Sequence, residues 1–336
     1  MNKSEVMAAL TSQSRKLKSA HEGSDLLRPL KQLPGTWKSE GLGWNIIALP
    51  FENGPLNYRV LMNQYSETIK FKDIAERVPN RGIVTDAFPP DIDLPDNEQS
   101  DQFVTTIDYE QSIKQVAAAD SPVSGLAGIQ NDEIHHEPGL FLHMLNKETN
   151  GIDIARLATI PHGDSVLALG KSSEIGGPPE IPEASALPLR VSQELSSPYL
   201  APYKVFVDTP FKGNVNVPDF PGFSPIDANV LLRLANSSVA IKKTTVLPFG
   251  TSLETGGIVN IPFIVKQANA TEMKAIFWLQ ELEELDVDGN PVLRLQYTQN
   301  VLLDFFKAPN SNELIRWPHI SINTLIKVPK SQEILV

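Results

Sequence analysis

The chain of 336 residues contains no cysteine. This absence excludes disulfides, zinc–thiolate sites, iron–sulfur clusters and nucleophilic thiols. Any metal or cofactor would therefore need other ligands, and the six histidines are the natural candidates.

Clusters of positive charge and long apolar runs are missing as well. Twenty-nine Lys and Arg stand against 40 Asp and Glu, a net charge of −11, and no basic block occurs. A protein that neutralises phosphates needs a cationic face, so nucleic acid and anionic membranes are not expected partners. No run approaches the roughly 18 apolar residues of a membrane helix, and the first twenty residues lack a secretory signal pattern. We expect a soluble cytoplasmic protein.

Alternating apolar and polar residues indicate a β-rich fold. Residues 103–116 and 293–305 both alternate in this way, as half-buried strands do. Asp288 and Gly289 precede the second segment and are typical of a hairpin turn. The 27 prolines cluster at 89–95, 178–188 and 198–225, which indicates connections or sheet edges.

Helices are predicted at two places. Residues 4–20 carry Val6, Met7 and Leu10 on one face, and a second helix is expected after an N-cap at Ser224 or Asp227. We therefore expect an N-terminal helical extension over residues 1–29. A single β domain over 30–336 follows, with an insertion at about 171–250.

Several segments resemble one family in the same order. Residues 30–43, LKQLPGTWKSEGLG, are similar to the opening of nitrobindins, small haem-binding β-barrels related in shape to fatty-acid-binding proteins. A GTW motif alone is weak evidence, because other lipocalin-like barrels begin with Gly-x-Trp. Residues 65–71, 134–141, 154–163, 269–299 and 317–327 resemble later segments of the family in turn, and this order is more specific than any one match.

The resemblance implies a mainly β, antiparallel calycin-like barrel with an N-terminal helix and an inserted loop and helix elaboration. It implies non-covalent haem b with His319 as the proximal iron ligand and His135 on the haem side. We count Thr36 and Trp37 of the opening motif as further cofactor-binding candidates. Trp278 and Trp317 are expected to line the cavity.

The same resemblance implies reactions of haem with small oxygen or nitrogen species. Peroxynitrite, nitric oxide and peroxide are the expected substrates, with peroxynitrite isomerase or peroxidase-like activity left undecided. The chain departs from the family through extra residues near 75–100 and 171–250, and through Trp44-Asn45-Ile46 after the glycines.

The alternation around His319 conflicts with this role. His319 shares its strand face with Ser321, Asn323 and Leu325, whereas the isoleucines at 320, 322 and 326 occupy the other face. If the apolar face pointed into the barrel, His319 would point out. A bulge or an inserted layer covering the barrel exterior would reconcile the two.

Alternative functions therefore stay open. The first is a barrel without haem that binds a lipid or another hydrophobic small molecule, and the second is a structural or partner-binding role, with a homodimer as one expectation. A zinc site is not expected, because His136-Glu137 lacks the HExxH spacing and His143 and His162 are weak metal candidates.

Overall fold

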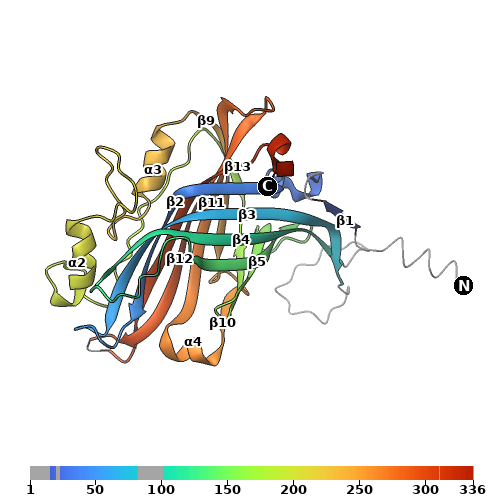
Figure 1. Ribbon diagram of the computed structural model, residues 1–336. Coiled ribbons are helices and arrows are strands. Elements are labelled where there is room, and N and C mark those ends of the chain that lie inside the picture. Colours follow the sequence, from blue (N-terminus) through green and yellow to red (C-terminus); the bar gives the residue numbers. More distant parts are fainter. Residues whose placement is uncertain (1–15, 20–22, 82–100, 310, 336) are drawn as a thin grey trace, which may run out of the picture.

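The computed structural model describes residues 16–19, 23–81, 101–309 and 311–335. Ten long antiparallel strands form a closed barrel (Figure 1). They are β2 (Gly35–Pro50), β3 (Tyr58–Asn80), β4 (Gln102–Ser121), β5 (Glu133–Met144), β6 (Ile154–Ile160), β7 (Asp164–Gly170), β9 (Ile241–Gly250), β11 (Asn269–Leu285), β12 (Pro291–Lys307) and β13 (Leu314–Lys327). Strands β13 and β2 pair, and β7 meets β9 at Leu169 and Gly250. The predicted antiparallel β-barrel is confirmed.

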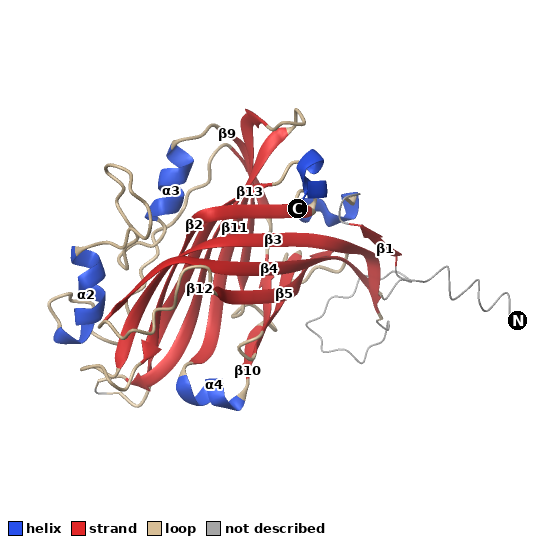
Figure 2. Cartoon of the chain, viewed as in Figure 1, coloured by secondary structure: helices blue, strands red, loops and turns tan. Residues whose placement is uncertain are grey.

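Shorter elements surround this barrel (Figure 2). They are β1 (Lys16–Ser19), η2 (Asp25–Leu30), β8 (Ser173–Gly176), η3 (Pro198–Leu200), α2 (Ala201–Asp208), α3 (Val230–Ser237), β10 (Gly257–Asn260), α4 (Pro262–Gln267) and η4 (Lys330–Leu335). Most of the helix predicted over 4–20 lies outside the described residues. For residues 16–19, which are described, the helix prediction is wrong, because these residues form strand β1 and pair with β3.

None of the helices in the described ranges is both long and apolar enough to cross a membrane.

The predicted strands and hairpin are confirmed. Residues 103–116 lie in β4, 293–305 lie in β12, and the turn between β11 and β12 contains Gly289 at φ 79°. Asp286 Oδ1 accepts hydrogen bonds from the backbone N–H groups of Asp288 and Asn290, each at 2.9 Å. These local bonds are those of an Asx turn, and they set the register of the hairpin.

One end of the barrel is sealed by η2. Leu27 and Leu30 in this element, and Leu33 after it, are buried against Trp37 at the start of β2. The Ser24 hydroxyl caps η2 by accepting from Leu26 N at 3.2 Å. Apolar surface at this end is thereby removed from water by the chain itself.

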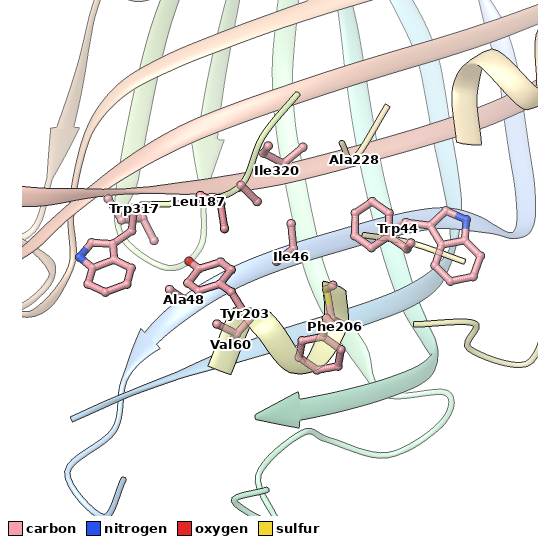
Figure 3. Close-up of a cluster of buried hydrophobic side chains, with 14 of the residues drawn as sticks. Trp44, Ile46, Ala48, Val60, Leu187, Tyr203, Phe206, Ala228, Trp317 and Ile320 are labelled. Atoms are coloured by element: carbon pink, nitrogen blue, oxygen red, sulfur yellow. The ribbon is translucent and has the colours of Figure 1, made fainter. Parts of the chain in front are cut away.

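The inserted segment forms a layer on the outside of the barrel wall. Figure 3 shows the contact, where Tyr203 and Phe206 of α2 lie against side chains of β2, β3 and β13. The buried residues of this outer cluster include Trp44, Ile46, Ala48, Val60, Leu187, Ala228, Trp317 and Ile320. Of the insertion predicted at 171–250, the last ten residues form barrel strand β9, so the covering layer ends before Ile241.

The helix predicted after Ser224 or Asp227 is α3, but it begins later. Its N-cap residue is Asn229, and the Asp227 carboxylate instead pairs with Arg233. The C-terminal end of α3 is held by Arg294 of β12, whose Nη1 donates to Ala235 O at 3.0 Å. Cations are favourable at a helix C-terminus.

The tryptophans divide between the two faces of the wall. Trp37 lies in the inner cluster, whereas Trp44, Trp278 and Trp317 belong to the outer one. The Trp317 ring stacks on Phe305 with centroids 4.6 Å apart. The expectation that Trp278 and Trp317 line the cavity is therefore wrong, because the inserted layer gives apolar side chains an outer face to pack on.

Candidate functional site at the polar end of the barrel

The inserted layer decides the direction of His319. Ile320 and Ile322 are fully buried in the outer cluster. Neighbouring residues of a strand point to opposite faces, so His319 points into the barrel. Leu325, on the same face as His319, lies in the inner cluster and agrees with this direction. The predicted conflict is resolved by a covered exterior.

His319 is a neutral imidazole held by a side-chain amide. Its Nε2 lies 2.5 Å from Asn45 Nδ2, which also donates to Ser321 Oγ at 2.8 Å. Burial lowers the pKa of His319 to about 4, and the charges of His135 and His162 act in the same direction. The ring is therefore uncharged at neutral pH, and its one nitrogen lone pair, on Nε2, faces the Asn45 amide.

A buried ion pair lies deeper in the barrel than His319. Glu137 of β5 accepts from Arg156 Nη2 of β6 at 2.6 Å and from the Tyr109 hydroxyl. Burial raises the pKa of the Glu137 carboxyl, but the Arg156 charge and the bonds from His135 and Tyr109 outweigh it and bring the pKa to about 2. Arg156 Nη1 also donates to Gln299 Oε1 at 2.6 Å, which joins β6 to β12 across the interior.

A second buried carboxylate has neutral donors instead of a cation. Glu67 of β3 accepts from Gln111 Nε2 at 2.6 Å, Tyr297 Oη at 2.7 Å and Asn323 Nδ2 at 2.5 Å. Burial raises the pKa of Glu67, and these donors offset only part of that effect. The charge of His135 acts on both Glu67 and Glu137.

His135 connects the carboxylates to the half-buried end. Its Nε2 lies 3.3 Å from Glu137 Oε2, and its ring centroid lies 5.9 Å from that of His162 in the turn between β6 and β7. The His135 side chain is 23% exposed, whereas Glu137 is 1% exposed. Protons and small molecules can therefore reach His135 more readily than the carboxylate behind it.

The other half of the interior is filled by aromatic rings. Phe141 lies at its centre, with ring centroids 5.2 Å from Tyr109, 5.3 Å from Phe249 and 5.6 Å from both Phe71 and Phe277. All five side chains are buried. By contrast, Asn45, His135, Gln299, His319 and Ser321 are only partly buried. The candidate site is therefore the polar end, opposite to η2.

The structure brings together some of the predicted site residues and not others. His319 and His135 lie at the polar end, but Thr36 and Trp37 lie at the η2 end of β2. Trp37 is fully buried and donates from Nε1 to Leu33 O at 2.8 Å. Thr36 and Trp37 thus belong to the sealed end of the barrel and do not accompany His319.

The remaining histidines have other surroundings. His136 lies on the strand face opposite to Glu137. Lys72 forms an ion pair with Glu110 and lowers the pKa of that carboxyl, and the charge of His136 helps to lower it. His143 is buried beside η2, with Nδ1 2.9 Å from Leu26 O. Within the described part of the chain, no three His, Asp or Glu residues form a cluster suited to a metal ion.

Sequence reasoning missed Asn45, Glu67 and Arg156. A signal existed for two of them. Glu67 shares strand parity with Tyr65, Ile69 and Phe71, and Arg156 stands inside the apolar strand IARLATI. A charged residue on an apolar strand face is buried and needs a partner. Nothing in the sequence identifies which partner each one has.

Comparisons with known proteins add little to this picture. No protein-family model matches the chain, and no curated protein matches it. A match among solved structures is the crystal structure of Rv2717c from M. tuberculosis, with 11% sequence identity and a TM-score of 0.35. The alignment covers 91% of this chain and 99% of that chain. A TM-score of this size supports no inference about function, and the resemblance to nitrobindins stays a prediction.

Proposed function

We propose that the polar end of the barrel binds haem b and that His319 is the residue that would hold the iron. The observation that carries the proposal is the inward direction of a neutral, partly accessible His319 in a chain without cysteine. Imidazole nitrogen is a common haem ligand. Inner-facing side chains beside it come from β2, β5, β12 and β13.

Binding of iron by His319 would require one rearrangement of its neighbours. Nε2 of His319 now accepts from Asn45, so iron ligation requires Asn45 to withdraw. Asn45 already donates to Ser321 and keeps that bond when it leaves His319. The competing hydrogen bond is worth about 1 kcal/mol net, far less than a metal–imidazole bond.

His135 is the residue best suited to move a proton at this site. Its Nε2 faces Glu137 Oε2, so Nε2 carries a proton and Nδ1 is free to accept one. Bound haem would supply an iron at which peroxynitrite, nitric oxide or peroxide can coordinate, and His135 would act as the acid–base partner.

Haem titration of the purified protein tests the proposal. The wild type should develop a Soret band that saturates at one haem per chain, and His319→Ala should lose it while keeping its melting temperature. His136→Ala is the matched control, because His136 lies on the opposite strand face and should leave the band unchanged. A wild-type protein that takes up no haem, or a His319→Ala variant with an unchanged spectrum, would contradict the proposal.

The alternative function is binding of a lipid or another hydrophobic small molecule in place of haem, and a separate experiment tests it. Aromatic rings fill the apolar half of the interior, and polar side chains line the other half, so an acyl chain would lack a continuous apolar wall inside the described barrel. Lipid extraction of the purified protein followed by mass spectrometry would detect a fatty acid at one per barrel if this alternative held.

A further inference from the structure

A hollow lies at the η2 end of the molecule. It measures about 540 Å³ and lies between the β11–β12 turn and the C-terminal residues that follow β13. Its apolar lining includes Leu285, Val287, Val292 and Ile326, and its polar lining includes Lys327 and Glu333. Lys327 is eight residues from His319 along β13, about 26 Å at 3.3 Å per residue, so this cavity is separate from the candidate haem site.

Lys327 is a partly buried lysine with a polar and an aromatic neighbour. Its Nζ donates to Gln32 O at 2.7 Å and lies 5.4 Å from the centroid of the Trp37 ring. Burial lowers the pKa of Lys327 to about 8, although the charge of Glu333 acts in the opposite direction. At pH 7 about one Lys327 side chain in ten is then a neutral amine, against roughly one in a thousand or fewer for a lysine with the ordinary pKa.

Glu333 is held beside this amine by the backbone of β2. Its Oε1 accepts from Thr36 N at 2.8 Å. A Cβ placed on Gly35 would lie 2.9 Å from Glu333 Oε1 and 3.2 Å from Lys327 Cε. Both side chains therefore pack over Gly35, and the Glu333 carboxylate lies near the Lys327 amine in the same hollow.

We propose that this cavity binds small apolar aldehydes, which condense with the Lys327 amine. The lone pair of the neutral amine adds to the carbonyl carbon, and a proton passes from nitrogen to oxygen to form a carbinolamine. Loss of that hydroxyl group with a proton, as water, leaves a C=N bond. Glu333 takes up the proton from nitrogen and returns it to the leaving hydroxyl. The imine nitrogen then takes up one proton from solvent, equivalent to the proton that the Lys327 ammonium group released when it became the neutral amine, and the resulting N–H donates to Gln32 O.

The four apolar residues of the lining select the aldehyde class. They provide surface for an alkyl chain, whose burial is favourable by about 0.8 kcal/mol for each CH₂ group. The cavity volume lies within the range of about 300 to 1,000 Å³ that is typical of small-molecule sites. A six-carbon aldehyde such as hexanal is therefore a suitable probe.

Reductive trapping tests the assignment. The full-length protein is incubated with hexanal and sodium cyanoborohydride at pH 7, and the alkylated lysines are identified by peptide mass spectrometry. Lys327 should be labelled at least about tenfold faster than Lys330, an exposed lysine of the same cavity. Its rate should saturate with hexanal concentration, because binding precedes condensation.

Two variants keep the test decisive. Lys327→Arg retains a cation over Trp37 and a donor to Gln32 O, so it should fold normally, lose the fast labelling and leave the rate at Lys330 unchanged. Glu333→Gln should slow labelling of Lys327 several-fold. Equal labelling rates at Lys327 and Lys330 in the folded wild type, or a rate at Lys327 that rises linearly without saturation, would overturn the proposal.

Discussion

The Nε2 atom of His319 lies 2.5 Å from the Nδ2 atom of Asn45 inside the barrel. An amide nitrogen only donates, so His319 accepts at Nε2 and carries its proton on Nδ1. If Nε2 were also protonated, its N–H would face the N–H of the Asn45 amide, and neither group could accept a hydrogen bond. The contact therefore adds to burial in keeping His319 neutral, and it makes Asn45 the residue that an incoming ligand must displace.

The protonation of His319 should couple to stability. The folded pKa is about 4 against 6.5 for the unfolded chain, so between these values the unfolded state binds the additional proton. Stability is then lost as pH falls from 6.5 to 4, by roughly 2 to 3 kcal/mol when the partial exposure of the ring is allowed for. We expect urea unfolding between pH 7 and 4 to show this loss.

The His319→Gln variant should not show this loss of unfolding free energy between pH 6.5 and 4, whereas the His136→Gln variant should still show it. An NMR titration of the folded protein gives an independent check. A His319 midpoint near 6.5 would show that the ring is not enclosed as described.

Removing one member of the Glu137–Arg156 pair should be costly. Glu137→Gln leaves the Arg156 charge buried without its partner, and we expect a loss of about 3 to 5 kcal/mol in the free energy of unfolding. The double variant Glu137→Gln with Arg156→Met should recover most of this loss, because neither charge is then buried alone. Additive effects of the two substitutions in urea unfolding would contradict the coupling.

The covered exterior of β13 can be tested with two isoleucines of one strand. Ile320 is fully buried beneath the inserted layer, whereas Ile326 is 39% exposed. Ile320→Ala should destabilise the protein by about 2 to 4 kcal/mol, through lost burial and the cavity that remains. Ile326→Ala should cost under about 1 kcal/mol. Similar losses for both in thermal unfolding would mean that the inserted layer does not stabilise the wall.

Gly43 makes room for a ring of the inner network. A Cβ at this position would lie 2.1 Å from Cε2 of Tyr65, whose hydroxyl lies 2.9 Å from that of Tyr297. Gly43→Ala should displace Tyr65 and cost about 1 to 3 kcal/mol. Gly176→Ala has open space around the new methyl group and should be nearly neutral. Equal melting temperatures for the two variants would refute the close approach.

Local patterns predicted much of the barrel. The alternation in residues 103–116 and 293–305 placed two strands correctly, and Asp288-Gly289 identified the turn, because both signals depend on neighbours in the chain. The N-terminal helix prediction was wrong over Lys16–Ser19, since pairing with β3 is a long-range contact. The start of α3 was misplaced because Asp227 pairs with Arg233 instead of capping the helix.

The candidate site was predicted only in part. His319 and His135 were identified through the family resemblance, and the structure places them at one end of the interior. Haem itself, the substrates, a homodimer and a cytoplasmic location stay predictions. The partners of Glu137 and Glu67 were not predictable, because they include residues of other strands: Arg156 is 19 residues from Glu137 in sequence, and Asn323 is 256 residues from Glu67.

By itself, the sequence determined which residues alternate, where the chain turns and that no thiol chemistry is available. The direction of His319 was decided by the tertiary structure alone. Alternation separates two faces of a strand without saying which is inside, and apolar residues normally mark the interior only when the exterior faces water. Here the segment between β7 and β9 covers the exterior, so the isoleucines of β13 pack outward and the histidine points in.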